Sequence, residues 1–282
     1  MKKALLSACL IAATGLLGCG QELSGYEEGG ELPTSAEETG AQSSELTTWW
    51  TPTPGTSWQI QLSGTLNTGF NVKVYDLDLF DTPASTIAGL KARGIKVICY
   101  FSAGSYEEWR SDASQFPASS LGNGLDGWPG ERWLDTRNLT VRAIMKKRMD
   151  LAKAKGCDAV DPDNVDGYAN DNGKGLTATT QLDYNKFLAT EAHLRGLAVG
   201  LKNDVDQIPA LLPYFDFSVN EECFQYNECN LVKPFITAKK AVFNIEYGGS
   251  SKASTVCPKA NSLNFDTLVK RLSLGAERIA CR

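Results

Sequence analysis

The feature that most constrains the fold of this chain is the alternation of short apolar runs with helical segments after residue 49. The runs are rich in Val, Ile, Phe or Tyr and most end in a polar cluster, which is typical of buried parallel strands. Strands that alternate with helices predict βα units and a parallel sheet. Eight runs are present, at residues 58–62, 72–77, 96–101, 159–163, 198–201, 215–219, 241–245 and 278–281.

Three of the intervening helices have clear boundaries. The first begins at Thr82-Pro83 and stops at Gly94, because Thr caps a helix, Pro suits its first position and Gly suits its end. The other two span residues 138–155 and 182–195, each with its apolar residues on one face. Eight strands in roughly 230 residues predict an α/β fold, a TIM-like (β/α)8 barrel. An open doubly wound sheet is the alternative, but no Gly-rich phosphate loop follows any strand.

The N-terminal residues resemble an export signal. Lys2 and Lys3 precede an apolar stretch, residues 4–17, which is shorter than the roughly 20 residues of a membrane helix. It ends in Leu16-Leu17-Gly18-Cys19, which resembles a bacterial lipobox. We therefore predict a lipoprotein signal peptide at residues 1–18 and a lipid on Cys19 that anchors the exported protein to a bacterial cell-envelope membrane (outer membrane or cell surface). A plain secretory signal that ends in cysteine is the alternative.

Residues 19–48 are predicted to form a disordered acidic tether, because they contain almost no large apolar residues. The tether holds seven Glu and no Lys or Arg. Removing these seven from 33 acidic residues, and Lys2 and Lys3 from 28 basic ones, leaves 26 of each for a single domain at residues 49–282. A formally neutral domain does not indicate nucleic-acid binding, so no nucleic-acid partner is predicted.

Six cysteines remain in this domain, an even number that favours disulfides in an exported protein. Six cysteines allow 15 pairings, so spacing alone does not decide among them. Cys223 and Cys229 are expected to close a short local loop, and Cys257–Cys281 is expected to tie down the C-terminal end. Cys99 and Cys157 would then pair by default, although both could instead be buried thiols.

Acidic side chains gather at the carboxyl ends of the predicted strands, where the active sites of such barrels lie. The only histidine, His193, lies in a helix that leads away from this rim, so neither a Ser-His-Asp triad nor a multi-histidine metal site is indicated. Residues 161–166 do not have the spacing of an EF-hand, and we predict no metal and no cofactor. Two-carboxylate glycoside hydrolysis remains as the chemistry that these side chains suit. The acids are Asp76, Asp78, Asp161, Asp163, Asp166, Asp204, Glu221, Glu222 and Glu246.

Several motifs resemble those of the family 114 glycoside hydrolases, the endo-α-1,4-polygalactosaminidases. The resemblance covers nearly everything after the tether. It implies a TIM-like barrel, a polysaccharide partner, and internal cleavage of α-1,4-linked galactosamine polymer. It also implies that an aspartate at the end of the fourth strand and a glutamate at the end of the sixth form the catalytic pair. The motifs are at residues 58–64 (WQIQLSG), 74–78 (VYDLD), 97–107 (VICYFSAGSYE), 127–135 (GWPGERWLD), 160–166 (VDPDNVD) and 219–223 (VNEEC).

The catalytic roles are carried over by position. Asp163 is the expected fourth-strand carboxylate, because the Asp-Asn step follows the last apolar residues of the strand; Asp161 shares its face and is the competitor. Glu221 and Glu222 point in opposite directions along the sixth strand, and we take Glu222 as the general acid. Retention or inversion depends on the separation of the two carboxyls, which the sequence leaves open.

Substrate-binding residues are expected along the same rim. Aromatic rings such as Tyr106 and Trp133 stack on sugar faces, and acidic side chains can hold the ammonium groups of a deacetylated polymer. The alternatives are that Asp76, Asp166 and Asp204 only orient their neighbours, that the barrel is a catalytically silent carbohydrate-binding protein, or that it hydrolyses another α-linked polysaccharide. The predicted substrate-binding set is Asp76, Asp78, Tyr100, Ser102, Trp128, Asp166, Lys202, Asn203, Glu246 and Tyr247.

Overall fold

The computed structural model describes residues 49–282. The predicted signal peptide, the tether and the lipidation site Cys19 lie outside these residues. In the described part of the chain, no helix is both long and apolar enough to cross a membrane.

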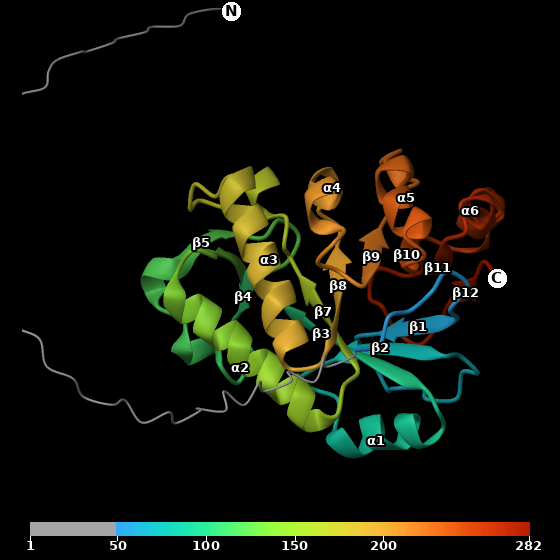
Figure 1. Cartoon of the computed structure of the whole chain (residues 1–282), viewed down its shortest axis with the longest axis horizontal. Coiled ribbons are helices and arrows are strands. Elements are labelled where there is room, and N and C mark those ends of the chain that lie inside the picture. Colours follow the sequence, from blue (N-terminus) through green and yellow to red (C-terminus); the bar gives the residue numbers. More distant parts are fainter. Residues whose placement is uncertain (1–48) are drawn as a thin grey trace, which may run out of the picture. The chain divides into compact units, whose positions relative to one another are not determined.

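In residues 49–282, eight parallel strands follow one another in chain order around a curled sheet, with helices on its outer side (Figure 1). This arrangement confirms the predicted TIM-like α/β barrel. Seven of the strands lie within a few residues of the predicted apolar runs. The eight are β1 (Trp58–Gln61), β2 (Val74–Asp78), β3 (Lys96–Ser102), β7 (Ala159–Asp163), β8 (Ala198–Lys202), β9 (Phe217–Glu221), β10 (Val242–Tyr247) and β11 (Asp266–Lys270).

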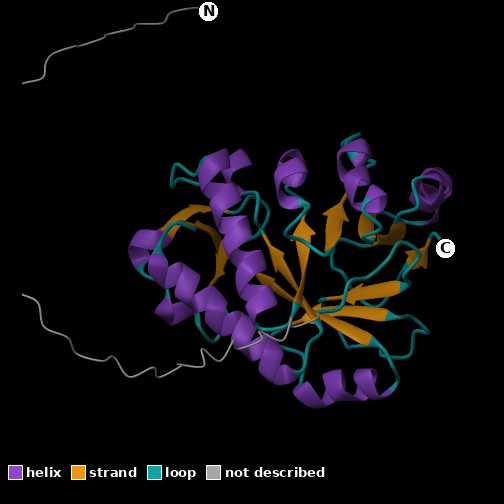
Figure 2. Ribbon diagram, in the orientation of Figure 1, coloured by secondary structure: helices purple, strands orange, loops and turns teal. Residues whose placement is uncertain are grey.

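The helices surround the strands on the outside of the sheet (Figure 2). No helix separates β1 from β2, as the short segment between them predicts. The three predicted helices are present, but the predicted Thr82 cap is wrong, because Pro83 is the N-cap of the first helix and no side chain caps it. Asn138 caps α2 by accepting from two backbone N–H groups, and Gly156 ends it at a φ of 89°. The helices are α1 (Ala84–Ala92), α2 (Leu139–Lys155), α3 (Ala178–Leu194), α4 (Ile208–Leu211), α5 (Cys229–Thr237) and α6 (Ser250–Ser262).

The prediction for the eighth strand is wrong. The segment at 278–281 forms only β12 (Ile279–Ala280), a short strand antiparallel to β11, and β11 itself takes the eighth parallel position. β11 has a charged residue at each end, which makes it look like a surface segment. Both ends are nevertheless buried, because Arg282 pairs with Asp266 at 2.6 Å and Lys270 Nζ donates to Ile60 O at 2.6 Å.

The first and last parallel strands of the sheet, β1 and β11, share no strand ladder within residues 49–282, and β12 pairs with β11 on that side. Side chains connect them instead. Trp58 Nε1 donates to Asp266 O at 2.7 Å, Arg278 donates to Trp58 O, and Lys270 reaches Ile60 O across the gap. These bonds satisfy backbone groups that would otherwise remain unpaired at a sheet edge.

The apolar core has two layers. One lies between the sheet and the helices and includes the predicted α2 stripe of Val141, Ile144, Met145, Met149 and Ala152. The other fills the barrel, with residues such as Trp58, Phe217 and Phe243. Gly200 on β8 belongs to this interior because a Cβ there would lie 2.5 Å from the ring of Phe217.

A small three-stranded sheet is inserted between β3 and α2. It consists of β4 (Ser105–Glu107), β5 (Leu121–Gly124) and β6 (Glu131–Leu134), in the order β4-β6-β5. Since it follows the carboxyl end of β3, and Leu134 N donates to Gly104 O at 2.9 Å, it stands on the rim where the carboxylates gather.

Three disulfides join the six cysteines in the pairs expected from spacing and elimination. They are Cys99–Cys157, Cys223–Cys229 and Cys257–Cys281, with sequence separations of 58, 6 and 24 residues. Disulfides are typical of proteins that fold in an oxidising compartment.

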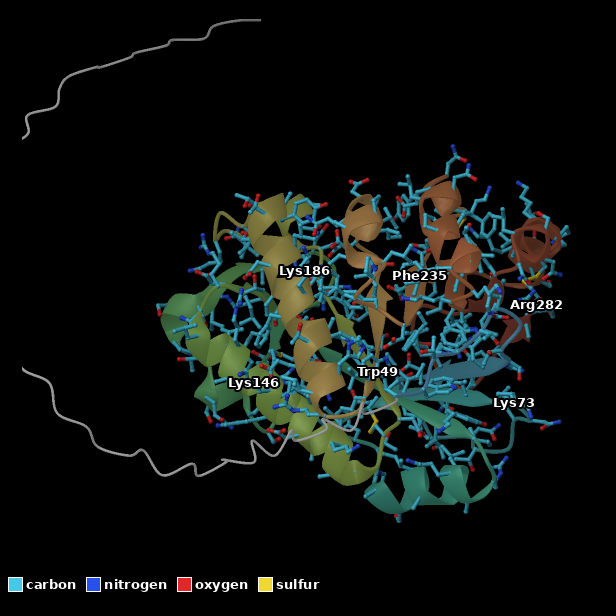
Figure 3. All side chains as sticks on the ribbon, viewed as in Figure 1. Trp49, Lys73, Lys146, Lys186, Phe235 and Arg282 are labelled. Carbon is cyan, nitrogen blue, oxygen red and sulfur yellow. A yellow bond between two sulfur atoms is a disulfide. The ribbon has the colours of Figure 1, made fainter. Side chains whose placement is uncertain are left out.

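The N-terminal segment closes the opposite end of the barrel. Trp49, at the start of the described residues (Figure 3), stacks on His193 near the end of α3 with ring centroids 3.8 Å apart. Its Nε1 donates to Asp216 at 2.8 Å. His193 Nε2 lies 2.9 Å from the other oxygen of Asp216. His193 therefore has a packing role at a distance from the rim, as its position in the sequence predicts.

Candidate active site

The buried ammonium group of Lys202 occupies the centre of the rim. Lys202 ends β8 and is 2% exposed. Its Nζ lies 3.6 Å from Asp161 Oδ2, 3.3 Å from Asp163 Oδ2 and 3.9 Å from Glu221 Oε2. Burial lowers the pKa of Lys202, but the three carboxylates outweigh it and hold that pKa well above its usual range. Lys202 is therefore a permanent cation between three acids.

Asp163 is fixed at the end of β7 by two hydrogen bonds. Tyr100 OH donates to its Oδ2 at 2.9 Å, and the backbone N–H of Asn164 donates to its Oδ1 at 2.7 Å. Burial, and then the charge of Asp163, raise the pKa of Tyr100 well above its usual range, so the phenol stays a donor. One face of the Asp163 carboxylate is thus held in place at the surface of the rim.

Glu221 is fixed in a similar way at the end of β9. Tyr247 OH donates to Glu221 Oε1, and the backbone N–H of Glu221 donates to Asn203 Oδ1 at 2.9 Å. Burial, followed by the charge of Glu221, raises the pKa of Tyr247. Since Asp163 and Glu221 both lie within 3.9 Å of the Lys202 nitrogen, they face each other across it.

Glu222, the residue chosen from the sequence, does not join this cluster. It follows β9 with a φ of 60°, in the left-handed region, so its side chain leaves the alternation of the strand. In residues 49–282 no hydrogen bond or ion pair connects its carboxylate to Asp163 or Lys202. Burial, and then the charge of Glu246, raise its pKa. The structure thus places Glu221 beside Lys202 and Glu222 outside the cluster.

Asp76 on β2 and Asp161 on β7 form a buried carboxyl pair next to Lys202. Both are 0% exposed, and neither accepts a hydrogen bond from an N–H group of the described residues. Burial, and then the charge of Asp161, hold the pKa of Asp76 well above its usual range. Two such carboxyls can hydrogen-bond to each other only when one keeps its proton, and these effects favour Asp76 as the one that keeps it.

Three other predicted residues have their oxygen atoms engaged inside the protein. Arg110 donates to both carboxylate oxygens of Asp78, at 3.1 and 2.7 Å. Glu246 is 0% exposed and accepts from Phe224 N at 2.9 Å, and Ser102 Oγ lies 2.5 Å from another hydroxyl. These groups shape the rim more than they present free acceptors at its surface.

The predicted aromatic residues divide into three groups. Tyr100 and Tyr247 donate to the carboxylates of Asp163 and Glu221, whereas Trp133 is buried and Tyr106 packs edge-on against a neighbouring ring. Trp128, in the turn before β6, is 50% exposed. It is therefore available to a sugar ring at the edge of the site.

Asp166 and Asp204 form a second acidic group beside the first. Burial, followed by the charge of Asp163, raises the pKa of Asp166 to about 6. Burial, followed by the charge of Asp166, raises the pKa of Asp204 to about 8. Asn185 Nδ2 donates to Asp204 Oδ2 at 2.7 Å, while Oδ1 has no partner among the described residues.

Replacing Asp204 with Asn is expected to make the stability of the folded protein less sensitive to rising pH. Because the folded pKa of about 8 exceeds the unfolded value, the neutral carboxyl contributes stability that is complete below about pH 4 and is lost as the pH rises through about 8. The loss is on the order of a few kcal/mol. Melting temperatures measured from pH 5 to 8 should therefore fall less steeply in Asp204→Asn than in the wild type. The exposed neighbour Asp206→Asn is the control, and an equal change in that variant would contradict this account.

Three residues at the rim were not predicted as site residues: Asn164, Ser105 and Glu131. Asn164 Nδ2 donates to Ser102 Oγ at 2.9 Å, and Ser105 Oγ donates to Glu131 Oε2 at 2.7 Å. Glu131 begins β6 in the inserted sheet and not at the end of a barrel strand, which is why a search of strand ends did not find it. Its presence in the GERW motif was the available signal.

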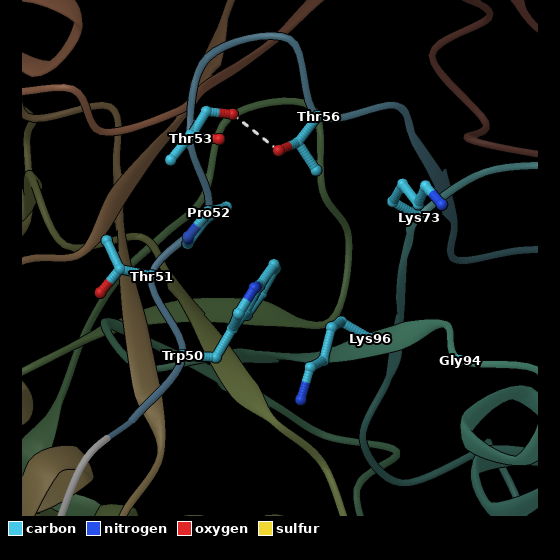
Figure 4. Close-up of a pocket in the computed structure, with 8 residues that line it drawn as sticks. All are labelled: Trp50, Thr51, Pro52, Thr53, Thr56, Lys73, Gly94 and Lys96. Atoms are coloured by element: carbon cyan, nitrogen blue, oxygen red, sulfur yellow. Dashed lines mark hydrogen bonds between the residues drawn. The ribbon is translucent and has the colours of Figure 1, made fainter.

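A separate cavity of about 260 Å³ lies near the N-terminal ends of β2 and β3, far along the strands from the carboxylates (Figure 4). None of the rim acids lines it. Among residues 49–282, no group of three or more His, Cys, Asp or Glu side chains is arranged to hold a metal ion. The cavity is lined by Trp50, Thr51, Pro52, Thr53, Thr56, Lys73, Gly94 and Lys96.

Known proteins resemble this chain at two levels, one in both sequence and fold and the other in fold alone. Among solved structures, the chain is similar to Ega3 of Aspergillus fumigatus, described in complex with galactosamine: 47% identity and a TM-score of 0.80, over 83% of this chain and 98% of that one. The glycoside hydrolase domain of PelA from Pseudomonas aeruginosa has 12% identity and a TM-score of 0.64, over 79% and 98% of the two chains, a likeness that shows the fold alone. No curated protein matches the chain. The profile of glycoside-hydrolase family GH114 matches residues 39–282. This chain is therefore a glycoside hydrolase and belongs to family GH114.

Proposed function

We propose that this glycoside hydrolase cleaves α-1,4-linked galactosamine polymers internally, using Glu221 as the general acid and Asp163 as the second carboxylate. The observation that carries the proposal is the position of these two carboxylates on either side of Lys202, at the ends of β9 and β7. The galactosamine bound to the similar Ega3 supports the class of substrate.

The two carboxylates suit different roles. Glu221 would protonate the glycosidic oxygen, while Asp163 would attack the sugar or activate a water molecule. The Tyr100 and Asn164 hydrogen bonds fix the orientation of the Asp163 carboxylate. Lys202 is close enough to balance the charge of both acids as the proton moves.

Short galactosamine oligosaccharides of mixed length are expected when the full-length protein is incubated with deacetylated α-1,4-galactosamine polymer. Internal cleavage releases such a mixture early, whereas cleavage from a chain end would release one small product. Mass spectrometry of the products over time measures this. Binding without cleavage would favour the silent carbohydrate-binding alternative, and cleavage only of another α-linked polymer would change the substrate.

The cellular location stays the prediction made from the sequence. The three disulfides support export, and the Leu-x-Gly-Cys motif supports a lipid on Cys19 that holds the enzyme at a cell-envelope membrane.

A further inference from the structure

A third carboxylate, Glu131, stands at the rim on the inserted sheet. Glu131 begins β6 and pairs in register with Glu107 of β4, directly after the carboxyl end of β3. Glu107 has its own counter-ions, since Arg110 lies 2.8 Å and Arg148 3.7 Å from its oxygens. In residues 49–282 no Lys or Arg nitrogen lies within ion-pair distance of Glu131. Glu131 is thus a partly buried acid without a cation.

A one-way chain of hydrogen bonds ties this carboxylate to the strand that carries Asp163. Asn164 Nδ2 and Ser105 N both donate to Ser102 Oγ, at 2.9 and 3.1 Å. The Ser102 hydroxyl must therefore donate its own proton to Ser105 Oγ, 2.5 Å away. Ser105 Oγ then donates to Glu131 Oε2 at 2.7 Å. The chain ends at the Glu131 carboxylate, which accepts a hydrogen bond and donates none.

The remaining oxygen of Glu131 is free for a ligand. No donor of the described residues reaches Oε1, and this atom is not among those sealed from solvent. A partly buried carboxylate gains stability from a cation that completes its environment. The polymer proposed above carries one ammonium group on each deacetylated sugar, and an N-acetyl group removes that charge.

We propose that Glu131 binds the ammonium group of a galactosamine unit beside Asp163, and so determines the preference for deacetylated over N-acetylated polymer. This inference rests on the proposed function for its ligand. The choice of Glu131, however, rests on three structural observations: its hydrogen bond from Ser105, its free Oε1 atom, and the lack of a counter-ion among the described residues.

The preference should depend on pH. Burial raises the pKa of Glu131 most, and the charges of Glu107 on β4 and Asp163 on β7 add to this rise, while the Ser105 hydroxyl and Arg110 lower it; the net pKa is about 7. Tyr100 on β3 also faces Glu131 and is neutral. Only the ionised carboxylate pairs with an ammonium group, so the preference should grow as the pH rises from 5 to 7.

The test measures binding, so it does not require cleavage. The methyl glycoside of an α-1,4-galactosamine disaccharide and its N-acetylated counterpart are titrated into the full-length protein at pH 5 and pH 7. The wild type should prefer the amine form about tenfold at pH 7 and less at pH 5, and Glu131→Gln should reduce this preference to about twofold or less. An unchanged preference in folded Glu131→Gln would overturn the proposal, whatever the protein cleaves.

Two further variants separate Glu131 from its surroundings. Glu108→Gln removes an exposed acid that follows β4 directly, next to Glu107, which pairs with Glu131; this variant should keep the preference for the amine form. An equal loss in that variant would mean that diffuse negative charge, not Glu131, selects the amine. Ser105→Ala removes the donor to Glu131 and should move the midpoint of the pH dependence upward. An unmoved midpoint would overturn the proposal even if Glu131→Gln failed to fold.

Discussion

Glu221→Gln is expected to lower kcat on galactosamine polymer by about a thousandfold or more, and Asp163→Asn should have an effect of similar size. Glutamine cannot supply a proton to the glycosidic oxygen, and asparagine can neither attack the sugar nor activate water. Both amides keep the size of the side chain and its bonds to Tyr247 or Tyr100, so the fold should survive. Initial rates at saturating polymer, with melting temperatures as the check on folding, measure the effect.

Glu222→Gln is the matched control for the general acid. Glu222 adjoins Glu221 in the chain but has no contact with Lys202, so its amide should keep kcat within about tenfold of the wild type. A thousandfold loss in Glu222→Gln, with an active Glu221→Gln, would return the acid role to Glu222.

Lys202→Met is expected to lower the free energy of unfolding by about 3–5 kcal/mol and kcat by roughly a hundredfold. Methionine nearly preserves the volume but leaves Asp161 buried with no cation and no donor. Asp163 and Glu221 would also face each other without the charge between them. Urea unfolding and kcat measure the two effects.

A double variant tests the cause. Asp161→Asn added to Lys202→Met should restore at least half of the lost stability, because the uncompensated carboxylate is gone, while activity should stay low. Lys153→Met, exposed on α2, should change neither quantity. A Lys202→Met protein as stable as the wild type would rule out Lys202 as the counter-ion of this site.

The fold could be predicted where burial on both faces of a strand leaves an apolar run. Strand β7 was predicted at its observed bounds, and β3 and β8 within one residue. β11 could not be recognised this way, because Asp266 and Lys270 are buried through partners far along the chain: Gly55 and Ile60, more than 200 residues away, and Arg282 at the C-terminal end. Charged residues are rarely buried without such partners, and the sequence does not show them.

The choice between the two glutamates turned on one backbone angle. Asp163, Lys202 and Glu221 each end a strand, and the next residue, Asn164, Asn203 or Glu222, has a positive φ of 59°, 49° or 60°. Asn is common in the left-handed region, so Asn164 and Asn203 mark in the sequence where their strands end. Glu222 has the same backbone conformation, but glutamate gives no such signal. Aligning the three strand ends puts Glu221, and not Glu222, at the position equivalent to Asp163 and Lys202.

The chain joins this domain at the end of the barrel that lies farthest from its acids. Trp49 packs on His193 at the foot of α3, and Ala241 N donates to Pro52 O at 2.9 Å beneath the strands. A domain fixed to a resin directly through Trp49 would therefore present the rim acids on the side opposite the point of attachment. An extended polymer could lie across that rim without its two ends striking the support, so immobilising the domain at this residue should not obstruct a long substrate.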